Sequence, residues 1–386
     1  MRASCRNPGA KTSAAVAARR IVADSIGVTD AAGPLLYVTP TDPALATGGR
    51  AKLSRLHQSL LHDLLGDGFH RLVLPSRGPN PVAAILRGQI DGIDAASLSA
   101  LSDRIAGHRI ERIFLDGSNL GSAARAIKRR HPAVRVITFC HNVEARFFLG
   151  ALRASPTPRS LAVLAANLNA ERAAVRASDM IITLSDRDSA LLQRLYGRGA
   201  DAVLPLAIED GYRRDALPPP RSPAPTPYLL FVGGGFYANR DAVRWYADRV
   251  APRLAIETMI VGHGMEQCPP APGITLVGAV EDLAPWYAHA LAVVAPIRDG
   301  SGMKTKVAEA LMFGKRIIAT AEAFSGYAPS VVVANRQCDD PASFAAAISE
   351  ACGDPPPGFD PAIRLLYDRF HAPAVARAGL AAIISA

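Results

Sequence analysis

Residues 291–314 read LAVVAPIRDGSGMKTKVAEALMFG, and this stretch decides the fold. The apolar run 291–295 is typical of a buried strand. A loop containing Gly300 and Gly302 follows, and apolar residues then recur at helical spacing as far as Gly314, which suits a helix C-terminus. The stretch therefore predicts a strand, a glycine loop and a helix, which is the unit from which parallel sheets are built.

The same alternation of short apolar runs and helical patterns covers most of the chain. A helix is predicted over Leu53 to Leu64, ending at Gly66. Strands separated by helices imply right-handed crossovers and parallel sheets with helices on both faces. Further strands are predicted at residues 35–38, 72–74, 110–115, 134–140, 180–184, 228–232, 259–261, 274–277, 317–318 and 331–333.

A proline-rich segment divides this pattern into two halves. Six of the ten residues from Pro218 to Pro227 are proline, which has no amide proton and a fixed φ, so the segment suits neither a sheet nor a helix. We expect an α/β protein with two Rossmann-like, doubly wound parallel-sheet domains that face each other across a cleft. The expected parts are a flexible basic extension (1–32), an acceptor-binding domain (33–215), a linker (216–227), a nucleotide-sugar-binding domain (228–370) and a C-terminal helix able to cross back to the first domain (371–386).

Composition excludes several classes of protein. The chain has 386 residues, 49% of them hydrophobic, and 43 basic against 34 acidic residues give a net charge of +9. No apolar run approaches the roughly 18 residues of a spanning helix. Aromatic residues are only 6% and no basic run has aromatics interleaved, which argues against nucleic acid as a partner. The five scattered cysteines include no C-x-x-C pair, so we expect free thiols in a reducing cytoplasm and no metal site.

Two basic regions could attract an anionic membrane surface. The first is the N-terminal extension, where Arg2, Arg6, Lys11, Arg19 and Arg20 precede the first acidic residue. An unselected tail explains this segment equally well. The second is the run Arg146-Phe147-Phe148 with Arg153 and Arg159, for which a packed helix is the alternative.

The loop at residues 300–302 is the strongest candidate binding site. Its glycines open a helix, whose N-terminus presents free amides and the positive end of the helix dipole, and Lys304 and Lys306 add positive charge. Such a place suits a diphosphate, and Glu309, one turn deeper, could accept hydrogen bonds from ribose hydroxyls. The alternative is a solvated helix with Lys306 and Glu309 as a surface pair.

Other candidates lie where predicted strands end, because ligands of parallel sheets bind outside the carboxyl ends of the strands. Glycine permits close approach of a ligand in three of these segments, and for Gly233-Gly234-Gly235 an ordinary tight turn is the alternative. The fourth contains polar side chains, for which a structural histidine is the alternative. The four segments are Gly48-Gly49-Arg50, Gly233-Gly234-Gly235, Gly262-His263-Gly264 and His141-Asn142-Val143-Glu144.

Several other motifs are rejected or missing. Asp186-Arg187-Asp188 has the D-x-D spacing of some metal–diphosphate sites, but Ser185 precedes a predicted helix and Asp188 follows three residues later, which indicates a capping box. The sequence contains no G-x-S-x-G, no H-E-x-x-H, and no G-x-G-x-x-G after the first strand. Hydrolases, zincins and dinucleotide oxidoreductases are therefore disfavoured.

Four segments in this order resemble the retaining glycosyltransferases of family 4, which have the GT-B fold. The resemblance covers roughly residues 34–330 and is most specific in the last segment, whose Gly-Ser-Gly-Met-Lys-Thr-Lys form is similar to a subgroup of bacterial polysaccharide and glycan biosynthesis enzymes. The segments are 138–144, 178–185, 230–239 and 296–320.

The resemblance implies roles for particular residues. His141 would lie beside the transferred sugar with Lys304 and Glu309 as the other catalytic residues, and Glu309 would hold the ribose. Many members carry two glutamates eight positions apart. In this sequence Ser301 stands at the position of the first glutamate, which is a departure from the family pattern. Donor-binding positions would be Gly234, Gly235, Arg240, Gly264, Val280, Gly300, Ser301, Gly302, Met303 and Lys306, and acceptor-side positions Gly48, Gly49, Arg50, Asn142 and Glu144.

The expected function is transfer of a sugar, with retention of configuration and without a metal or other cofactor, from a nucleotide sugar to a lipid-linked glycan acceptor. Amides and cations would stabilise the leaving nucleoside diphosphate, and closure of two domains would exclude water. The expected location is the cytoplasm, at the inner face of the plasma membrane. Alternatives are a sugar-nucleotide epimerase or phosphorylase on the same fold, and a non-catalytic binding or scaffold protein.

Overall fold

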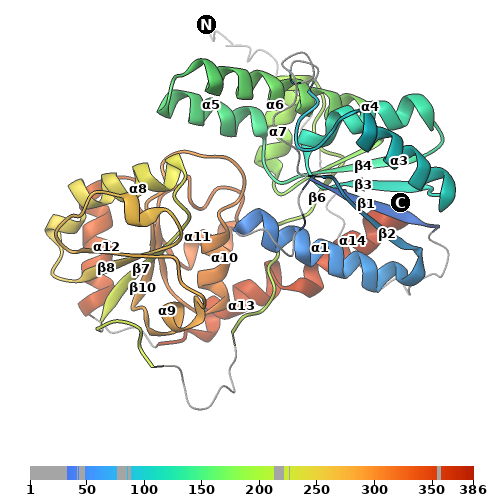
Figure 1. Cartoon of the computed structure of the whole chain (residues 1–386). Helices are drawn as coiled ribbons and strands as arrows, with labels where there is room; N and C mark the ends of the chain where they lie inside the picture. Colours follow the sequence, from blue (N-terminus) through green and yellow to red (C-terminus); the bar gives the residue numbers. More distant parts are fainter. Residues whose placement is uncertain are drawn as a thin grey trace, which may run out of the picture.

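The computed structural model describes residues 33–40, 42, 48–75, 85, 88–212, 221–225, 227–353 and 358–386. The expected N-terminal extension and much of the expected linker, including residues 216–220 and 226, lie outside the described residues. The described chain forms two lobes (Figure 1), each built on a six-stranded sheet whose strands pair in parallel.

The N-terminal sheet has the strand order β2-β1-β3-β4-β5-β6. Its strands are β1 (Leu35–Thr39), β2 (Phe69–Val73), β3 (Arg112–Leu115), β4 (Arg135–Cys140), β5 (Met180–Thr183) and β6 (Ala202–Val203). The helices of this domain are α1 (Gly49–Leu65), α3 (Ala95–Gly107), α4 (Gly121–Arg130), α5 (Glu144–Ala154), α6 (Pro158–Ala177) and α7 (Asp186–Tyr196). Short 3₁₀ turns η1 (Gly66–Gly68) and η2 (Ser118–Leu120) complete it.

The C-terminal sheet has the order β12-β11-β10-β7-β8-β9. Its strands are β7 (Tyr228–Val232), β8 (Glu257–Val261), β9 (Ile274–Gly278), β10 (Ala292–Ala295), β11 (Ile317–Ala319) and β12 (Arg336–Gln337). The remaining helices are α8 (Tyr237–Arg249), α9 (Ala284–His289), α10 (Thr305–Met312), α11 (Pro329–Val333), α12 (Pro341–Gly353), α13 (Pro361–Phe370) and α14 (Pro373–Ser385). Two 3₁₀ turns are η3 (Ala251–Arg253) and η4 (Met265–Gln267).

Each sheet reverses its strand order at one point, and these points locate the site. In the N-terminal sheet β1 lies between β2 and β3, and in the C-terminal sheet β7 lies between β8 and β10. The connections that follow the two strands at such a point run in opposite directions. This opens a crevice at the carboxyl ends of the strands. The loops after β1, β3, β7 and β10 are therefore the places where a ligand can approach the sheets.

The chain crosses between the lobes at two neighbouring segments. Residues after β6 lead toward the second domain, and the junction of α13 and α14 returns beside them: Ile208 N–H donates to His371 O (3.0 Å), and Tyr367 Oη donates to Ile208 O (2.9 Å). The helix α14 then packs along α1 (Figure 1), and Arg112 of β3 donates to Ile384 O near its end. The C-terminus thus ends on the N-terminal domain.

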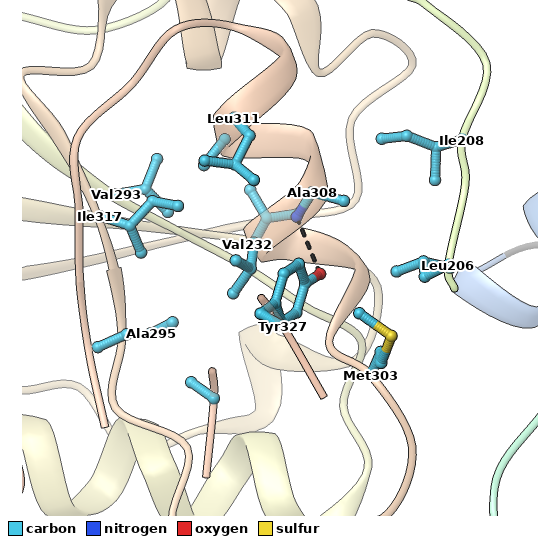
Figure 2. Packing of buried hydrophobic residues seen from close by; sticks show 14 of the residues in the cluster. Leu206, Ile208, Val232, Val293, Ala295, Met303, Ala308, Leu311, Ile317 and Tyr327 are labelled. Carbon is cyan, nitrogen blue, oxygen red and sulfur yellow. Dashed lines mark hydrogen bonds between the residues drawn. The ribbon is translucent and has the colours of Figure 1, made fainter. Parts of the chain in front are cut away.

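The core of the C-terminal domain is continuous with the first crossing segment. Figure 2 shows Leu206 and Ile208 beside Met303 and the helix α10. Tyr327 lies in the middle of this cluster, where its hydroxyl accepts a hydrogen bond from Ala308 N–H (3.1 Å) and donates to Lys304 O (2.8 Å). The buried side chain of Tyr327 therefore holds the start of α10 in place through two hydrogen bonds.

One predicted strand is wrong, and one predicted helix begins later than expected. Residues 331–333 belong to the helix α11, because Pro329 occupies its first turn and only Val331 is buried while Val333 is 82% exposed. Met303 precedes α10, whose N-cap is Lys304, so residues 300–304 are loop. The short strands β6 and β12 have two residues each and carry no sequence pattern long enough to predict them.

Candidate functional site

The carboxyl ends of the two sheets meet directly. Ser301, in the loop after β10, exchanges two hydrogen bonds with Val143, in the turn after β4: its Oγ accepts from Val143 N–H and donates to Val143 O, both at 3.1 Å. A Cβ added to Gly302 would lie 2.9 Å from His141 O, and the residue has φ +65°. A larger residue at position 302 would therefore separate the lobes. Ser301, which stands where the resemblance would place a first glutamate, serves as a contact between the domains.

Two helix N-termini converge on this crevice, one from each domain. The helix α1 begins at Gly49 and α10 at Thr305, and a Cβ added to Gly49 would lie 2.1 Å from Thr305 Oγ1. Neither helix has a side-chain cap at its N-terminus, and neither has an acidic residue in its first turn. Two positive dipole ends without a carboxylate to satisfy them form a place suited to an anion.

Lys304 lies beside a carboxylate that was not predicted from the sequence. Its Nζ lies 3.1 Å from Glu322 Oε1 and donates to Gly302 O (2.8 Å). Two arginines of the N-terminal domain reach the same carboxylate, Arg146 at 3.1 Å and Arg187 at 2.8 Å. Burial would raise the pKa of Glu322, but Lys304 and Arg187 hold it below its usual value. Glu322 thus joins three cations across the domain boundary.

Lys306 has a different environment. It is buried, its Nζ donates to Asn239 Oδ1 (2.8 Å), and the ammonium lies 4.0 Å from the centre of the Phe231 ring. Burial lowers the pKa of Lys306 to about 7. Glu309 is buried as well, so the alternative of a solvated surface pair formed by these two residues is wrong.

Glu309 is engaged from both domains. Its Oε1 accepts a hydrogen bond from Lys52 Nζ of α1 (2.5 Å), and its Oε2 accepts one from Tyr287 Oη of α9 (2.8 Å). Lys52 therefore brings a third lysine to the crevice from the first turn of α1. A nucleotide that used the Glu309 carboxylate would share it with these two groups or displace Lys52.

The glycine loop after β7 is closed against the neighbouring turn. Gly233 N–H donates to Val261 O (2.9 Å) and Gly235 N–H to His263 O (2.8 Å). A Cβ on Gly235 would lie 2.5 Å from Gly264 O, so the two turns touch through their backbones. The amide of Gly235 is thus already used, although the loop stays at the edge of the crevice.

The remaining residues predicted to bind the donor lie at the rim of the C-terminal domain. Arg240 of α8 donates to Gln267 Oε1 (2.9 Å), which directs it toward the turn at Gly264. Val280 follows β9 and is half-buried. Gly300 adopts φ +131°, and its carbonyl accepts a hydrogen bond from Arg146 Nε (2.7 Å).

His141 forms a buried pair with Asp116, which follows β3. The distance from His141 Nε2 to Asp116 Oδ1 is 2.7 Å, and Ser54 Oγ (2.8 Å) and Thr39 Oγ1 (3.0 Å) donate to the other carboxylate oxygen. Burial would raise the pKa of Asp116, but His141, Arg50 and Ser54 hold it well below its usual range. Burial lowers the pKa of His141. An ionised Asp116 only accepts hydrogen bonds, so neutral His141 carries its proton on Nε2 and leaves Nδ1 as an acceptor.

The residues predicted on the acceptor side include a second buried carboxyl group. Glu144 lies 3.9 Å from Arg50, and its backbone N–H donates to Glu171 Oε1 (2.8 Å). Burial raises the pKa of Glu144 to about 7. Asn142 is half-buried between His141 and the Gly302 loop. Arg50 is fixed by Asp116 O (3.0 Å) and Asn119 Oδ1 (3.1 Å).

The D-x-D segment is part of a helix start, as predicted. Ser185 is the N-cap of α7 and accepts a hydrogen bond from Asp188 N–H, while its Oγ donates to the Asp188 carboxylate (2.9 Å). Across the described ranges, no group of three or more His, Cys, Asp or Glu side chains could hold a metal ion.

In the same ranges no helix is long and apolar enough to cross a membrane.

Sequence reasoning located the loops of this site and missed several of its side chains. Asp116 follows β3 and Glu322 follows β11, so the rule that selected His141 at the end of β4 could have selected both. Lys52 lies one turn into α1, beside the Gly48–Arg50 segment. Tyr287 carries no signal in the sequence.

Comparison with known proteins agrees with this architecture. A family model described as glycosyl transferases group 1 matches residues 226–354, which is most of the C-terminal domain. No curated protein sequence is significantly similar to the chain. Several solved structures have the same fold over nearly the whole chain.

Three of these structures illustrate the likeness. Sucrose-phosphate synthase from Thermosynechococcus elongatus is 14% identical with a TM-score of 0.67, over 92% of this chain and 98% of that one. Anabaena HepE in complex with UDP is 12% identical, with a TM-score of 0.60 over 91% and 99%. The lipopolysaccharide outer core galactosyltransferase WaaB is 12% identical, with a TM-score of 0.59 over 92% and 99%. The chain thus has a two-domain GT-B fold, and the family match supports a GT-B glycosyltransferase.

Proposed function

We propose that this protein transfers a sugar from a nucleotide-sugar donor to a glycan acceptor, with the diphosphate of the donor bound where α1 and α10 meet. The observation that carries the proposal is the convergence of two uncapped helix N-termini from opposite domains. Lys52 adds positive charge at this point, and Lys306 adds an amine in the first turn of α10. A leaving nucleoside diphosphate gains negative charge, which dipoles and cations fixed in advance stabilise.

The finer parts of the function rest on the resemblance of residues 296–320 to retaining family 4 enzymes. We propose retention, independence of a metal, and an acceptor that is a lipid-linked glycan of a polysaccharide pathway. The solved complexes of HepE with UDP and with UDP-glucose make uridine nucleotides the first donors to test. Transfer to an acceptor, as opposed to donor isomerisation or phosphate-dependent cleavage, separates this proposal from an epimerase or a phosphorylase.

Thermal stabilisation by nucleoside diphosphates and nucleotide sugars tests the donor site. A ligand that binds only the native state at 100 times its Kd stabilises it by about 2.7 kcal/mol, so UDP is expected to raise the Tm. The variant Thr305→Glu places a carboxylate at the first position of α10, where it favours the helix and occupies the anion site. The rise in Tm is expected to disappear in this variant.

A matched control is Ser330→Glu, which places the same side chain in the first turn of α11 at an exposed position. This variant is expected to respond to UDP like the wild type. If UDP still raises the Tm of the Thr305→Glu variant, the diphosphate binds elsewhere. If uridine, guanosine and adenosine diphosphates all leave the Tm unchanged, the donor site itself is refuted.

We further propose that the tip formed by α5 and α6 contacts an anionic membrane surface. Leu149 (37%) and Leu161 (57%) are exposed there, and Arg153 and Arg159 are exposed between them. Arg146 is not part of this surface, because Glu322 and Gly300 engage it. A basic residue near an anionic surface contributes about 1 kcal/mol.

Sedimentation with phosphatidylglycerol vesicles tests the membrane proposal. The double variant Arg153→Glu, Arg159→Glu is expected to reduce binding at low salt by more than tenfold, since each reversal removes one attraction and adds one repulsion. Arg253→Glu, at an exposed position of η3 in the other domain, is the control. Absence of vesicle binding by the wild type at low salt would defeat the idea.

A further inference from the structure

Lys304 and Lys306 are two residues apart, but only one of them has its charge neutralised. Lys304 lies 3.1 Å from the Glu322 carboxylate. Lys306 donates to a neutral amide, Asn239 Oδ1, at 2.8 Å, and no carboxylate of the described residues forms an ion pair with it. A buried ammonium group without a counter-charge is costly, and a bound anion would remove that cost.

Lys306, in the first turn of α10, lies directly behind the glycine loop at residues 233–235. A Cβ added to Gly233 would meet Lys306 Nζ at 3.0 Å and Asn239 Nδ2 at 2.6 Å. Asn239 Nδ2 in turn donates to Gly234 O (2.6 Å). The amine is thus connected to the loop through one buried amide, and a phosphate beside the loop would act on it through protein of low dielectric constant.

The surroundings of Lys306 oppose its positive charge while the site is empty. Burial has the largest effect and Lys304 adds to it, whereas Glu309, the acidic neighbour on the same helix, favours the charge; together they lower the pKa of Lys306 to about 7. Glu309 is itself shared with Lys52 and Tyr287. The other groups in contact, Asn239 of α8 and Phe231 of β7, are uncharged. Near neutral pH a large share of the molecules therefore carries a neutral amine.

We propose that Lys306 takes up a proton from solvent when a nucleoside diphosphate binds at the N-terminus of α10, beside the glycine loop at residues 233–235. The proposal rests on the proposed function, because it requires a diphosphate bound where α1 and α10 meet. A neighbouring anion favours the ammonium form, so the site gains one positive charge when the ligand arrives and returns it to solvent when the ligand leaves. Binding of the diphosphate then weakens as the pH rises, by about tenfold per pH unit where the uptake approaches one proton.

Isothermal titration calorimetry with UDP measures this uptake. At pH 8.0 the titration is done in HEPES and in Tris, whose heats of ionisation differ, and the difference in observed heat gives the number of protons exchanged. The terminal phosphate of UDP titrates near pH 6 and is silent at this pH. With a pKa of about 7, most of the Lys306 amines are neutral at pH 8.0, so the wild type is expected to take up a measurable fraction of one proton per UDP bound.

Three variants distinguish Lys306 from other sources of protons. Lys306→Met is expected to bind UDP more weakly with no proton uptake. Lys306→Arg retains a permanent charge and is expected to bind UDP with no uptake, and it serves where the methionine variant binds too weakly to measure. Lys52→Met removes the crevice lysine that the N-terminal domain contributes and is expected to retain the uptake of the wild type.

The outcomes separate the inference from the function on which it rests. UDP binding without proton uptake by the wild type, or uptake that persists in both Lys306 variants, overturns the role of Lys306 and leaves the donor site intact. If neither UDP nor inorganic pyrophosphate binds to the wild type, the donor site is wrong and the inference fails with it.

Discussion

The variant Asp116→Ala is expected to lower the free energy of unfolding by about 3–5 kcal/mol, because several buried hydrogen-bond donors lose their acceptor. Asp116 is 1% exposed and accepts hydrogen bonds from His141, Ser54 and Thr39. Alanine would leave these three groups without their acceptor in the interior, and each unsatisfied group costs about 1–3 kcal/mol before relaxation. Urea unfolding of the two proteins at pH 7.5 measures the difference.

The control for this prediction is Asp116→Asn, which keeps the shape and one acceptor oxygen. We expect it to lose less stability than the alanine variant. It no longer requires the proton of His141 to reside on Nε2, because an amide can both donate and accept. An alanine variant as stable as the wild type would contradict the buried network.

The variant Glu322→Ala is expected to open the crevice and to cost about 3 kcal/mol of stability, since it leaves Lys304, Arg146 and Arg187 without their shared carboxylate. Lys304 is 9% exposed, so water cannot fully replace Glu322 there. The two arginines belong to the other domain, and their repulsion from Lys304 would drive the lobes apart. Small-angle X-ray scattering is expected to show a larger radius of gyration than in the wild type.

Glu350→Ala is the matched control for Glu322. Glu350 also pairs with an arginine at 2.8 Å, but both partners are about half exposed and lie in the same domain. Exposed ion pairs contribute about 0–1 kcal/mol, so this variant is expected to keep both the stability and the radius of gyration. Equal effects of the two substitutions would show that the carboxylate at position 322 has no special place between the domains.

Much of the fold could be predicted from local patterns, and the exceptions have identifiable causes. The apolar runs at residues 35–38, 228–232 and 292–295 are buried strands of two parallel sheets. Residues 331–333 are β-branched and apolar, yet they form one helical turn after Pro329. Proline at a helix start outweighed strand propensity over so short a segment.

The candidate site was predicted in part. Loops such as 300–302 and 141–144 could be found because the ends of parallel strands collect at one edge of a sheet. The partners of their side chains could not be found in this way. Lys52 and Glu309 are 257 residues apart, and Arg146 and Glu322 are 176 apart, so no local pattern relates them.

The sequence by itself determined two parallel α/β sheets, the loops at their carboxyl ends and the glycines that let those loops come close, because strand, helix and turn preferences act over a few residues. Only the tertiary structure decided which charges are neutralised: Lys304 by Glu322, Glu309 by Lys52, and Lys306 by no carboxylate among the described residues. Ionisation and hydrogen bonding depend on burial and on neighbours within a few ångströms, and folding alone brings those neighbours together.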